Sequence, residues 1–261
     1  MKESPMPDVQ SQADNREIPL GKVGVKGLEY PIRVLDKVKK VQYTTAKVDL
    51  FANLPQHFKG THMSRFVEIF HSFREDLSMP RFLEMLGCIR DDLDAESAFG
   101  SMEFSYFIEK KAPVSQLPGI MSYRCLYRGS VGCQTPNFTV AVSVPICTVC
   151  PCSKAISERG AHNQRGIVTV ELELGPFFWL EDMIALVENA ASSPVYSLLK
   201  REDEKFVTEQ AYDRPMFVED LVRDVYARIQ DLGQFPRFSV EAENFESIHN
   251  HSAYAFVEFA T

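Results

Sequence analysis

The feature that most constrains the fold of this chain is a series of runs in which apolar and polar residues alternate. Between Phe138 and Ile146, for example, every second residue is Phe, Val or Ile, and the residues between them are mostly small or polar. A period of two is typical of a β-strand with one buried face. The pattern predicts strands at 23–35, 41–50, 102–108, 121–127, 138–146, 167–174, 237–245 and 253–259.

Amphipathic helical patterns lie between these pairs of strands. Apolar residues there recur with the spacing i, i+3, i+4 and i+7, which indicates helices with one buried face. Pro80 suits the first turn of such a helix, and Gly233 is expected to end another. The charged segment 200–213 is expected to be a loop. The positions expected to face the core are Phe66, Ile69, Phe70 and Phe73; Phe82, Met85, Leu86, Ile89 and Leu93; Leu180, Met183, Ile184 and Val187; and Phe217, Leu221, Val225 and Ile229.

Each half of the chain therefore has the element order ββααββ, which indicates a tandem duplication. Residues 1–20 are polar and without a period, so we expect a mobile tail. The first unit is expected to span 21–132, and the second 133–261. Runs of antiparallel strands with helices laid on one face place the chain in the α+β class.

Composition limits the possible functions. The chain has 261 residues and a net charge of −8, which argues against a general nucleic-acid or membrane-surface binder. No apolar run approaches the roughly 20 residues that a membrane-spanning helix needs, and the N-terminus lacks the apolar core of a signal peptide. We therefore expect a cytoplasmic protein, in which the six cysteines are thiols or metal ligands rather than a disulfide framework.

Three cysteines and a histidine stand between the two predicted strands 138–146 and 167–174. They are Cys147, Cys150, Cys152 and His162, and Lys154 and Arg165 lie among them. Thiolate and neutral imidazole are preferred ligands of zinc and similar divalent ions, and the two cations could hold an anionic substrate.

This cluster leaves two kinds of metal site open. Four ligands would make a closed structural Cys3His zinc site, whereas fewer ligands would leave a position for catalysis. If the strand continued past Ile146, Cys150 and Cys152 would face one way and Cys147 the other. The spacing of Cys147 and Cys150 also fits a redox pair, but no helix signature follows it. The remaining cysteines, Cys88, Cys125 and Cys133, are expected to be ordinary buried or boundary thiols.

Three stretches carry a specific resemblance. They are 60–66 (GTHMSRF), 150–154 (CPCSK) and 162–166 (HNQRG), and together with the element order they resemble the type IB GTP cyclohydrolase I family, which has the tunnelling fold. The resemblance implies two fold units per chain and a homotetramer whose subunits close barrels. It also implies hydrolysis of GTP to 7,8-dihydroneopterin triphosphate and formate, the entry to tetrahydrofolate biosynthesis.

The resemblance also implies a metal site. Opening the imidazole ring of GTP needs a water that is nucleophilic at neutral pH, and a bound divalent metal supplies one. The implied ligands are Cys150, His162 and Glu204, with Glu202 and Asp203 close enough to Glu204 in sequence to compete with it. One metal per active site is expected, and this donor set fits zinc, manganese or iron(II). The resemblance also implies an acidic and imidazole pair that lines the same site: His249, for proton transfer or occasional metal ligation, and Glu246 in the same shell.

Substrate recognition is assigned by the same resemblance. Glu219 is expected to accept two hydrogen bonds from the guanine edge, although a carboxylate in a first helical turn can also merely favour the helix dipole. The other residues also have simpler interpretations. Glu204 would then be a solvated loop residue in a run of charges, and Arg65 would cap or solvate a helix face. The residues expected to bind the triphosphate are His62, Ser64, Arg65, Lys154 and Arg165.

Two other functions remain open at this point. One is a tunnelling-fold nitrile reductase of queuosine synthesis, which uses a cysteine and nicotinamide but no metal. The other is a non-catalytic purine- or pterin-binding scaffold with a structural Cys3His zinc, which chelation would unfold. Metal content and GTP turnover separate these functions from the GTP cyclohydrolase.

Overall fold

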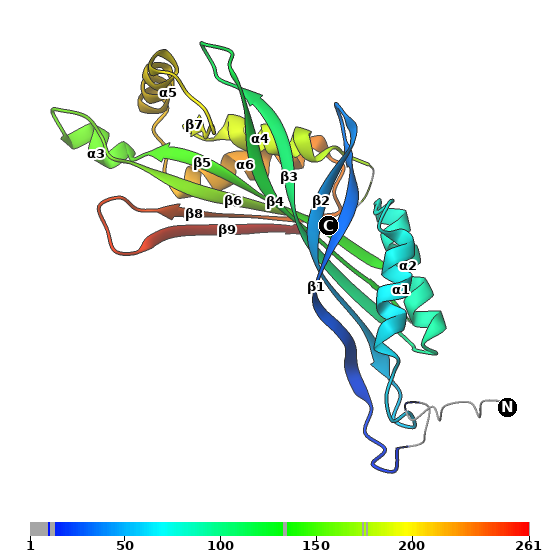
Figure 1. The fold of residues 1–261 in the computed structure, drawn as a ribbon. Coiled ribbons are helices and arrows are strands. Elements are labelled where there is room, and N and C mark those ends of the chain that lie inside the picture. The colour runs from blue at the N-terminus through cyan, green and yellow to red at the C-terminus, as the bar shows by residue number, and fades with distance from the viewer. Residues whose placement is uncertain (1–9, 11–13, 133–134, 174, 176, 261) are drawn as a thin grey trace. The chain divides into compact units, whose positions relative to one another are not determined.

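The computed structural model describes residues 10, 14–132, 135–173, 175 and 177–260 (Figure 1). Within these residues the chain forms a nine-stranded antiparallel sheet with the order β1-β2-β3-β4-β5-β6-β8-β9, and the short β7 pairs with β5. The α+β class is confirmed, and every run with period two forms a strand. The strands are β1 (Leu20–Asp36), β2 (Lys40–Leu54), β3 (Ala98–Lys111), β4 (Pro118–Val131), β5 (Asn137–Val149), β6 (Asn163–Glu173), β7 (Ser193–Pro194), β8 (Arg237–Phe245) and β9 (Ser252–Ala260).

The sheet belongs to two compact units that share β3 and β4. The first contains the described residues of 1–104 together with 126–138, and the second contains 105–125 and the described residues of 139–261. The ends of β3 and β4 that are joined to each other, within 105–125, thus belong to the second unit. The division of the chain into a first unit 21–132 and a second unit 133–261 stays a prediction. Most of the expected tail, and also Cys133 and Leu174, lie outside the described residues.

In the first unit, α1 (Met63–Phe73) and α2 (Met79–Asp92) pack beside each other against the sheet (Figure 1). Nearly all the helical positions predicted to face the core are buried, and Ile69 and Leu93 are half-buried. Two glycines let α2 approach the strands closely. A Cβ at Gly100 would lie 2.9 Å from Leu86 Cδ2, and one at Gly129 would lie 3.1 Å from Phe82 Cε1.

In the second unit, the main helices are α4 (Leu180–Ala190) and α6 (Val218–Leu232). Their apolar faces are buried as predicted, with one exception. Phe217 precedes α6 as its N-cap residue and is exposed, because the helix begins one residue later than its apolar spacing indicates. Gly233 ends α6 in the left-handed conformation with φ 61°, which confirms the predicted C-cap.

Two further helices correct the prediction. The strand β5 ends at Val149, and a short helix, α3 (Pro151–Ile156), follows at once. The charged segment expected to be a loop forms α5 (Arg201–Asp213). Asp203 stabilises the start of α5, because its buried carboxylate accepts a hydrogen bond from the N–H group of the N-cap residue Lys200. The same carboxylate also accepts hydrogen bonds from the N–H groups of Val114 and Ser115. Burial alone would raise the pKa of Asp203, but these bonds and the Ser115 hydroxyl hold the pKa well below its usual range.

A buried charged cluster ties α4 to the outer ends of β3 and β4. Lys110 Nζ lies 2.8 Å from Glu188 Oε1 and donates to Val195 O at 3.0 Å. The Tyr123 hydroxyl donates to the same Glu188 oxygen at 2.8 Å. Burial lowers the pKa of Lys110, and the nearby Glu188 carboxylate opposes that shift. Lys110 therefore supplies the counter-charge that the buried Glu188 carboxylate needs.

Replacing Lys110 with Met should lower the free energy of unfolding by about 3 kcal/mol, because the buried Glu188 carboxylate loses its counter-ion. Urea denaturation followed by circular dichroism measures this change. Lys111→Met is the matched control, since Lys111 is the exposed neighbour on the same strand. Equal stability of the two variants would mean that the ion pair contributes nothing to the fold.

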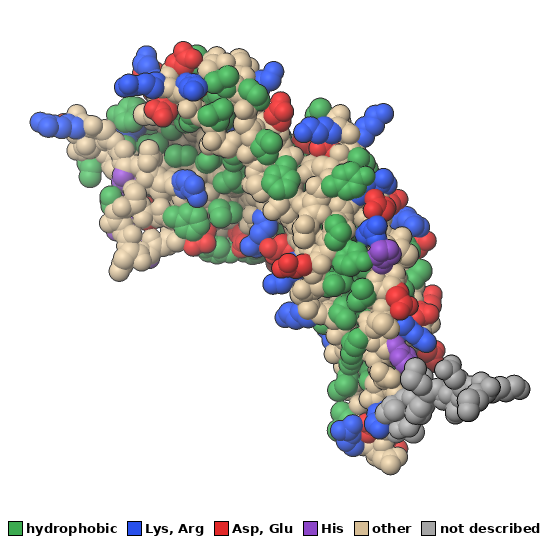
Figure 2. All heavy atoms as spheres, viewed as in Figure 1, with side chains coloured by type: hydrophobic (Ala, Val, Ile, Leu, Met, Phe, Trp, Pro, Cys, Tyr) green, Lys and Arg blue, Asp and Glu red, His purple; other side chains and the backbone are tan. Residues whose placement is uncertain are grey.

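The face of the molecule drawn in Figure 2 carries mixed charge. Figure 2 shows Lys and Arg side chains interspersed with Asp and Glu side chains on the visible face. Among the helices of the described residues, none is both long enough and apolar enough to span a bilayer.

Candidate functional site

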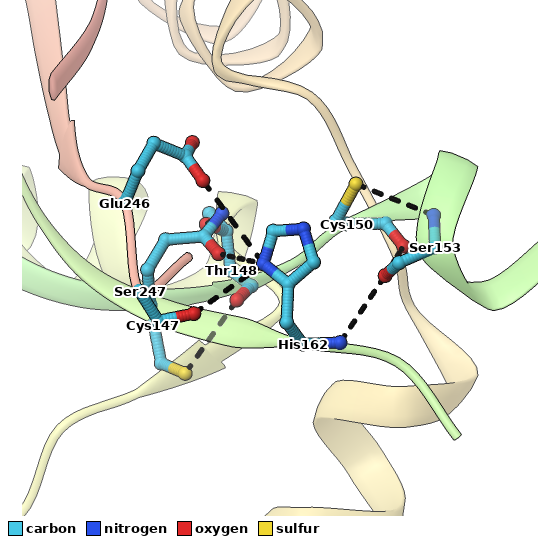
Figure 3. A network of polar contacts seen from close by, with 8 residues as sticks. Cys147, Thr148, Cys150, Ser153, His162, Glu246 and Ser247 are labelled. Atoms are coloured by element: carbon cyan, nitrogen blue, oxygen red, sulfur yellow. Dashed lines mark hydrogen bonds and ion pairs between the residues drawn. The ribbon is translucent and has the colours of Figure 1, made fainter. Parts of the chain in front are cut away.

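The centre of the candidate site lies where β5 ends and β6 begins. Antiparallel pairing of these strands runs to Val149 opposite Asn163, and the Cys150 N–H then donates to the His162 carbonyl at 3.1 Å. Cys150 is the N-cap residue of α3, and its sulfur accepts a hydrogen bond from the Ser153 N–H at 3.5 Å. The structure therefore brings two predicted metal ligands, Cys150 and His162, side by side (Figure 3).

Oxygen atoms surround one nitrogen of the His162 ring. Nδ1 lies 3.1 Å from Gln164 Oε1, 3.5 Å from Ser247 Oγ and 4.0 Å from Glu246 Oε2. In Figure 3 the other ring nitrogen lies on the side of the imidazole that faces Cys150. The structure thus also brings Glu246, which is predicted to line the same site, to the Cys150–His162 pair.

Gln164 is a member of this site that the sequence reasoning missed. Its side chain is buried, and its amide Nε2 donates to Thr148 Oγ1 at 2.9 Å. Thr148 is opposite Gln164 in the β5–β6 register and is itself fully buried. The sequence signal was the spacing of two between Gln164 and His162, which puts both side chains on one face of a strand.

The other two cysteines of the cluster do not join this pair. Cys147 points away from Cys150, as Figure 3 shows, and burial raises the pKa of the Cys147 thiol. Cys152 is exposed on α3, so the premise of a continuing strand that would align Cys150 with Cys152 is wrong. In the part of the chain that the structure describes, no three His, Cys, Asp or Glu side chains form a metal cluster. The described residues therefore do not assemble a closed Cys3His site.

The predicted third ligand comes from α5. Glu204 and Glu202 are both exposed in the first turn of this helix, whereas Asp203 between them is buried and bound to backbone N–H groups. Asp203 thus has a structural role. The structure does not bring Glu204 to Cys150 and His162, and its role as a ligand stays a prediction.

His249 lies in the exposed segment between β8 and β9, three residues after Glu246. Its ring stacks on that of His251, with centroids 5.1 Å apart and an angle of 14° between the planes. The same segment contains Glu246 and Ser247, which lie beside the His162 ring. The proton-transfer role of His249 stays a prediction.

Comparison with known proteins identifies the family. A profile described as "Type I GTP cyclohydrolase folE2" matches residues 6–255. The chain belongs to this family. It is 54% identical over 254 residues to "GTP cyclohydrolase FolE2" of Syntrophotalea carbinolica, covering 97% of this chain and 95% of that protein. It is 51% identical over 253 residues to the protein of the same name from Geobacter sulfurreducens, covering 97% and 98%.

Solved structures show the fold of this FolE2 family member independently. The uricase of Arthrobacter globiformis matches with a TM-score of 0.55 at 7% identity, covering 93% of this chain and 94% of that one. A uricase from Bacillus fastidious matches with a TM-score of 0.56 at 5% identity, covering 92% of both chains. The likeness confirms the tunnelling fold and, at this identity, carries no functional argument.

The residues predicted to bind GTP in this FolE2 enzyme are spread over both units. In the second unit, Lys154 donates to the Tyr212 carbonyl and lies 4.1 Å from the centre of the Tyr212 ring, so it also joins α3 to the end of α5. Arg165 is exposed on β6, in register with Cys147. Glu219 is exposed in the first turn of α6.

In the first unit, His62, Ser64 and Arg65 lie at the start of α1. Arg65 Nη1 donates to the Asp92 carbonyl at 2.7 Å and lies 3.4 Å from the Asp92 carboxylate. Arg65 thus links α1 to the end of α2, and an additional contact with the triphosphate stays a prediction.

Proposed function

We propose that this chain hydrolyses GTP to 7,8-dihydroneopterin triphosphate and formate, as a type IB enzyme at the entry to tetrahydrofolate biosynthesis in the cytoplasm. The observation that carries the proposal is the pairing of Cys150 with His162 at the β5–β6 junction, in a chain that matches the family over nearly its whole length. The names of the curated relatives support GTP as the substrate.

The donors at this junction fit one divalent metal in their chemistry. The Cys150 sulfur can supply a thiolate. His162 engages Nδ1 with Gln164, so that Nε2 can act as a ligand. We propose Glu204 as the third protein ligand, with zinc, manganese or iron(II) as the metal. When bound, such a metal lowers the pKa of a water towards ~7 and so provides a nucleophile at neutral pH.

The remaining roles fall to side chains around the pair. We propose that the Glu246 carboxylate, 4.0 Å from His162 Nδ1, supports the imidazole ligand from the same shell as His249. We propose His249 as the group that transfers protons to the purine as its imidazole ring opens. Glu219 is proposed to hold the guanine edge. His62, Ser64, Arg65, Lys154 and Arg165 are proposed to hold the triphosphate.

The decisive experiment incubates GTP with the metal-free protein and with protein loaded separately with zinc, manganese or iron(II). Formate release and the fluorescence of the oxidised neopterin product are followed together. Turnover that requires metal supports the proposal. Absence of formate with every metal contradicts it, and oxidation of a nicotinamide cofactor or unfolding on chelation would instead favour the reductase or the scaffold.

We also propose that the chain forms a homo-oligomer, a tetramer, with active sites completed by neighbouring copies. In the described part of the sheet, β1 and β9 are the two ends of the strand order and each pairs on one side only. The end strand β9 exposes Tyr254 (60%) and Phe256 (53%). Unpaired backbone groups beside exposed aromatic side chains favour pairing with another chain.

Light scattering coupled to size-exclusion chromatography should therefore report a symmetric assembly larger than the 29.6 kDa chain. Charge introduced on β9, as Phe256→Lys, should shift the assembly towards smaller species and lower GTP turnover with it. Phe107→Lys, at another exposed aromatic residue on β3, serves as the control. A stable monomer with full activity would contradict the shared-site proposal.

A further inference from the structure

The surroundings of His162 are asymmetric. Gln164 Oε1 is within hydrogen-bonding distance of Nδ1 at 3.1 Å, whereas the Glu246 carboxylate at 4.0 Å is too far to bond directly. A carboxylate at that distance still favours a proton on the nearer nitrogen, because opposite charges attract strongly in a partly buried site. Gln164 and Glu246 therefore both favour the tautomer that carries its proton on Nδ1, and the Ser247 hydroxyl, 3.5 Å from the same nitrogen, can accept as well as donate.

The Gln164 amide is held by a buried partner on the neighbouring strand. Its Nε2 donates to Thr148 Oγ1 at 2.9 Å, and its Oε1 lies 3.1 Å from His162 Nδ1. Thr148 and Gln164 occupy opposite positions of the β5–β6 ladder, and both side chains are buried. The pairing of two strands thus holds the amide in place.

We propose that Gln164, held in place by Thr148, is a positioning residue that keeps His162 as the Nδ1–H tautomer. In this state the Nε2 lone pair is presented on the side of Cys150. The inference rests on the proposed function, because it assigns the lone pair to the metal ion of that function. A histidine ligand needs its second nitrogen engaged in this way, and loss of such a partner typically weakens metal binding by about 10–100-fold.

The main test is Gln164→Met, which keeps the length of the side chain but removes both amide groups. Its affinity for Zn²⁺ alone, measured by competition with a chromophoric chelator at fixed pH, should fall by about 10–100-fold. Gln164→Glu retains an acceptor for Nδ1–H and should keep the Zn²⁺ affinity close to that of the wild type. The control on the same strand is Thr169→Val, which loses only its contact with Ser143 and should bind Zn²⁺ normally.

A second measurement does not depend on metal. In ¹⁵N-labelled metal-free protein, at a pH where His162 is neutral, long-range ¹⁵N–¹H spectra locate the ring proton. The wild type should carry it on Nδ1, and Gln164→Met should move the population towards Nε2–H. Because this readout needs only a folded chain, wild-type spectra decide the tautomer even if Gln164→Met fails to fold.

The outcomes separate the two proposals. A wild-type proton on Nε2, or wild-type Zn²⁺ affinity in Gln164→Met, overturns the positioning role even when formate release is normal. Absence of both formate release and Zn²⁺ binding in the wild type overturns the proposed function and the metal-presenting role together. The location of the proton then still decides whether Gln164 sets the tautomer.

Discussion

Replacing Cys150 with Ala should abolish GTP turnover and lower the metal content of the same preparation. A thiolate at the end of β5 would be at once a ligand and the main negative charge offered to the metal, so its loss removes affinity and activity together. The measurement combines formate release with metal analysis of the purified protein. The mutation should not unfold the chain, because Cys150 is only half-buried and makes one weak side-chain bond, to the Ser153 N–H.

Cys147→Ala is the matched control for Cys150→Ala. The two thiols are three positions apart, but Cys147 points away from Cys150, and partial burial raises the pKa of the Cys147 thiol. We expect this variant to retain its metal and most of its turnover. Full activity in Cys150→Ala would refute the metal assignment, and equal metal loss in both variants would favour a closed structural site.

The regular parts of this fold are readable from local patterns. Alternation over 138–146 predicts β5, and the spacing of Leu221, Val225 and Ile229 predicts α6, because each pattern reflects a single buried face. The helix α5 is not predicted by the same reasoning. It has few apolar residues, and its start depends on hydrogen bonds from Val114 and Ser115 to Asp203, which are distant in sequence.

The candidate site shows the same limit. Cys150 and His162 are predictable as neighbours because one follows a strand and the other precedes its antiparallel partner. Gln164 is harder to predict. Its spacing of two from His162 puts both side chains on one face, but that spacing does not distinguish a buried glutamine that orients a ring from one that faces solvent. Glu204 is a harder case, because its assignment comes from family resemblance and depends on how a separate helix meets the strand ends.

Helix α6 also separates two carboxylates that look alike in sequence. Asp220 Oδ2 accepts the Phe217 N–H at 3.2 Å and so satisfies the start of the helix, with Arg223 at 3.5 Å from its other oxygen. Glu219, its neighbour, is exposed in the same turn. The helix therefore already has its stabilising carboxylate, and Glu219 is available for the guanine edge in our hypothesis.

Glu219→Gln should consequently weaken GTP binding at least tenfold while metal content and oligomeric state stay normal. The guanine edge offers adjacent N–H donors that one carboxylate can accept together, and the variant turns one acceptor oxygen into an NH₂ group that faces a donor. Each lost contact costs roughly 1.5–3 kcal/mol, which is about one to two orders of magnitude in affinity. Equilibrium binding of GTP measures the effect. Asp220→Asn is the control, expected to lower helix stability but leave GTP affinity unchanged, and normal GTP binding by Glu219→Gln would place the guanine anchor elsewhere.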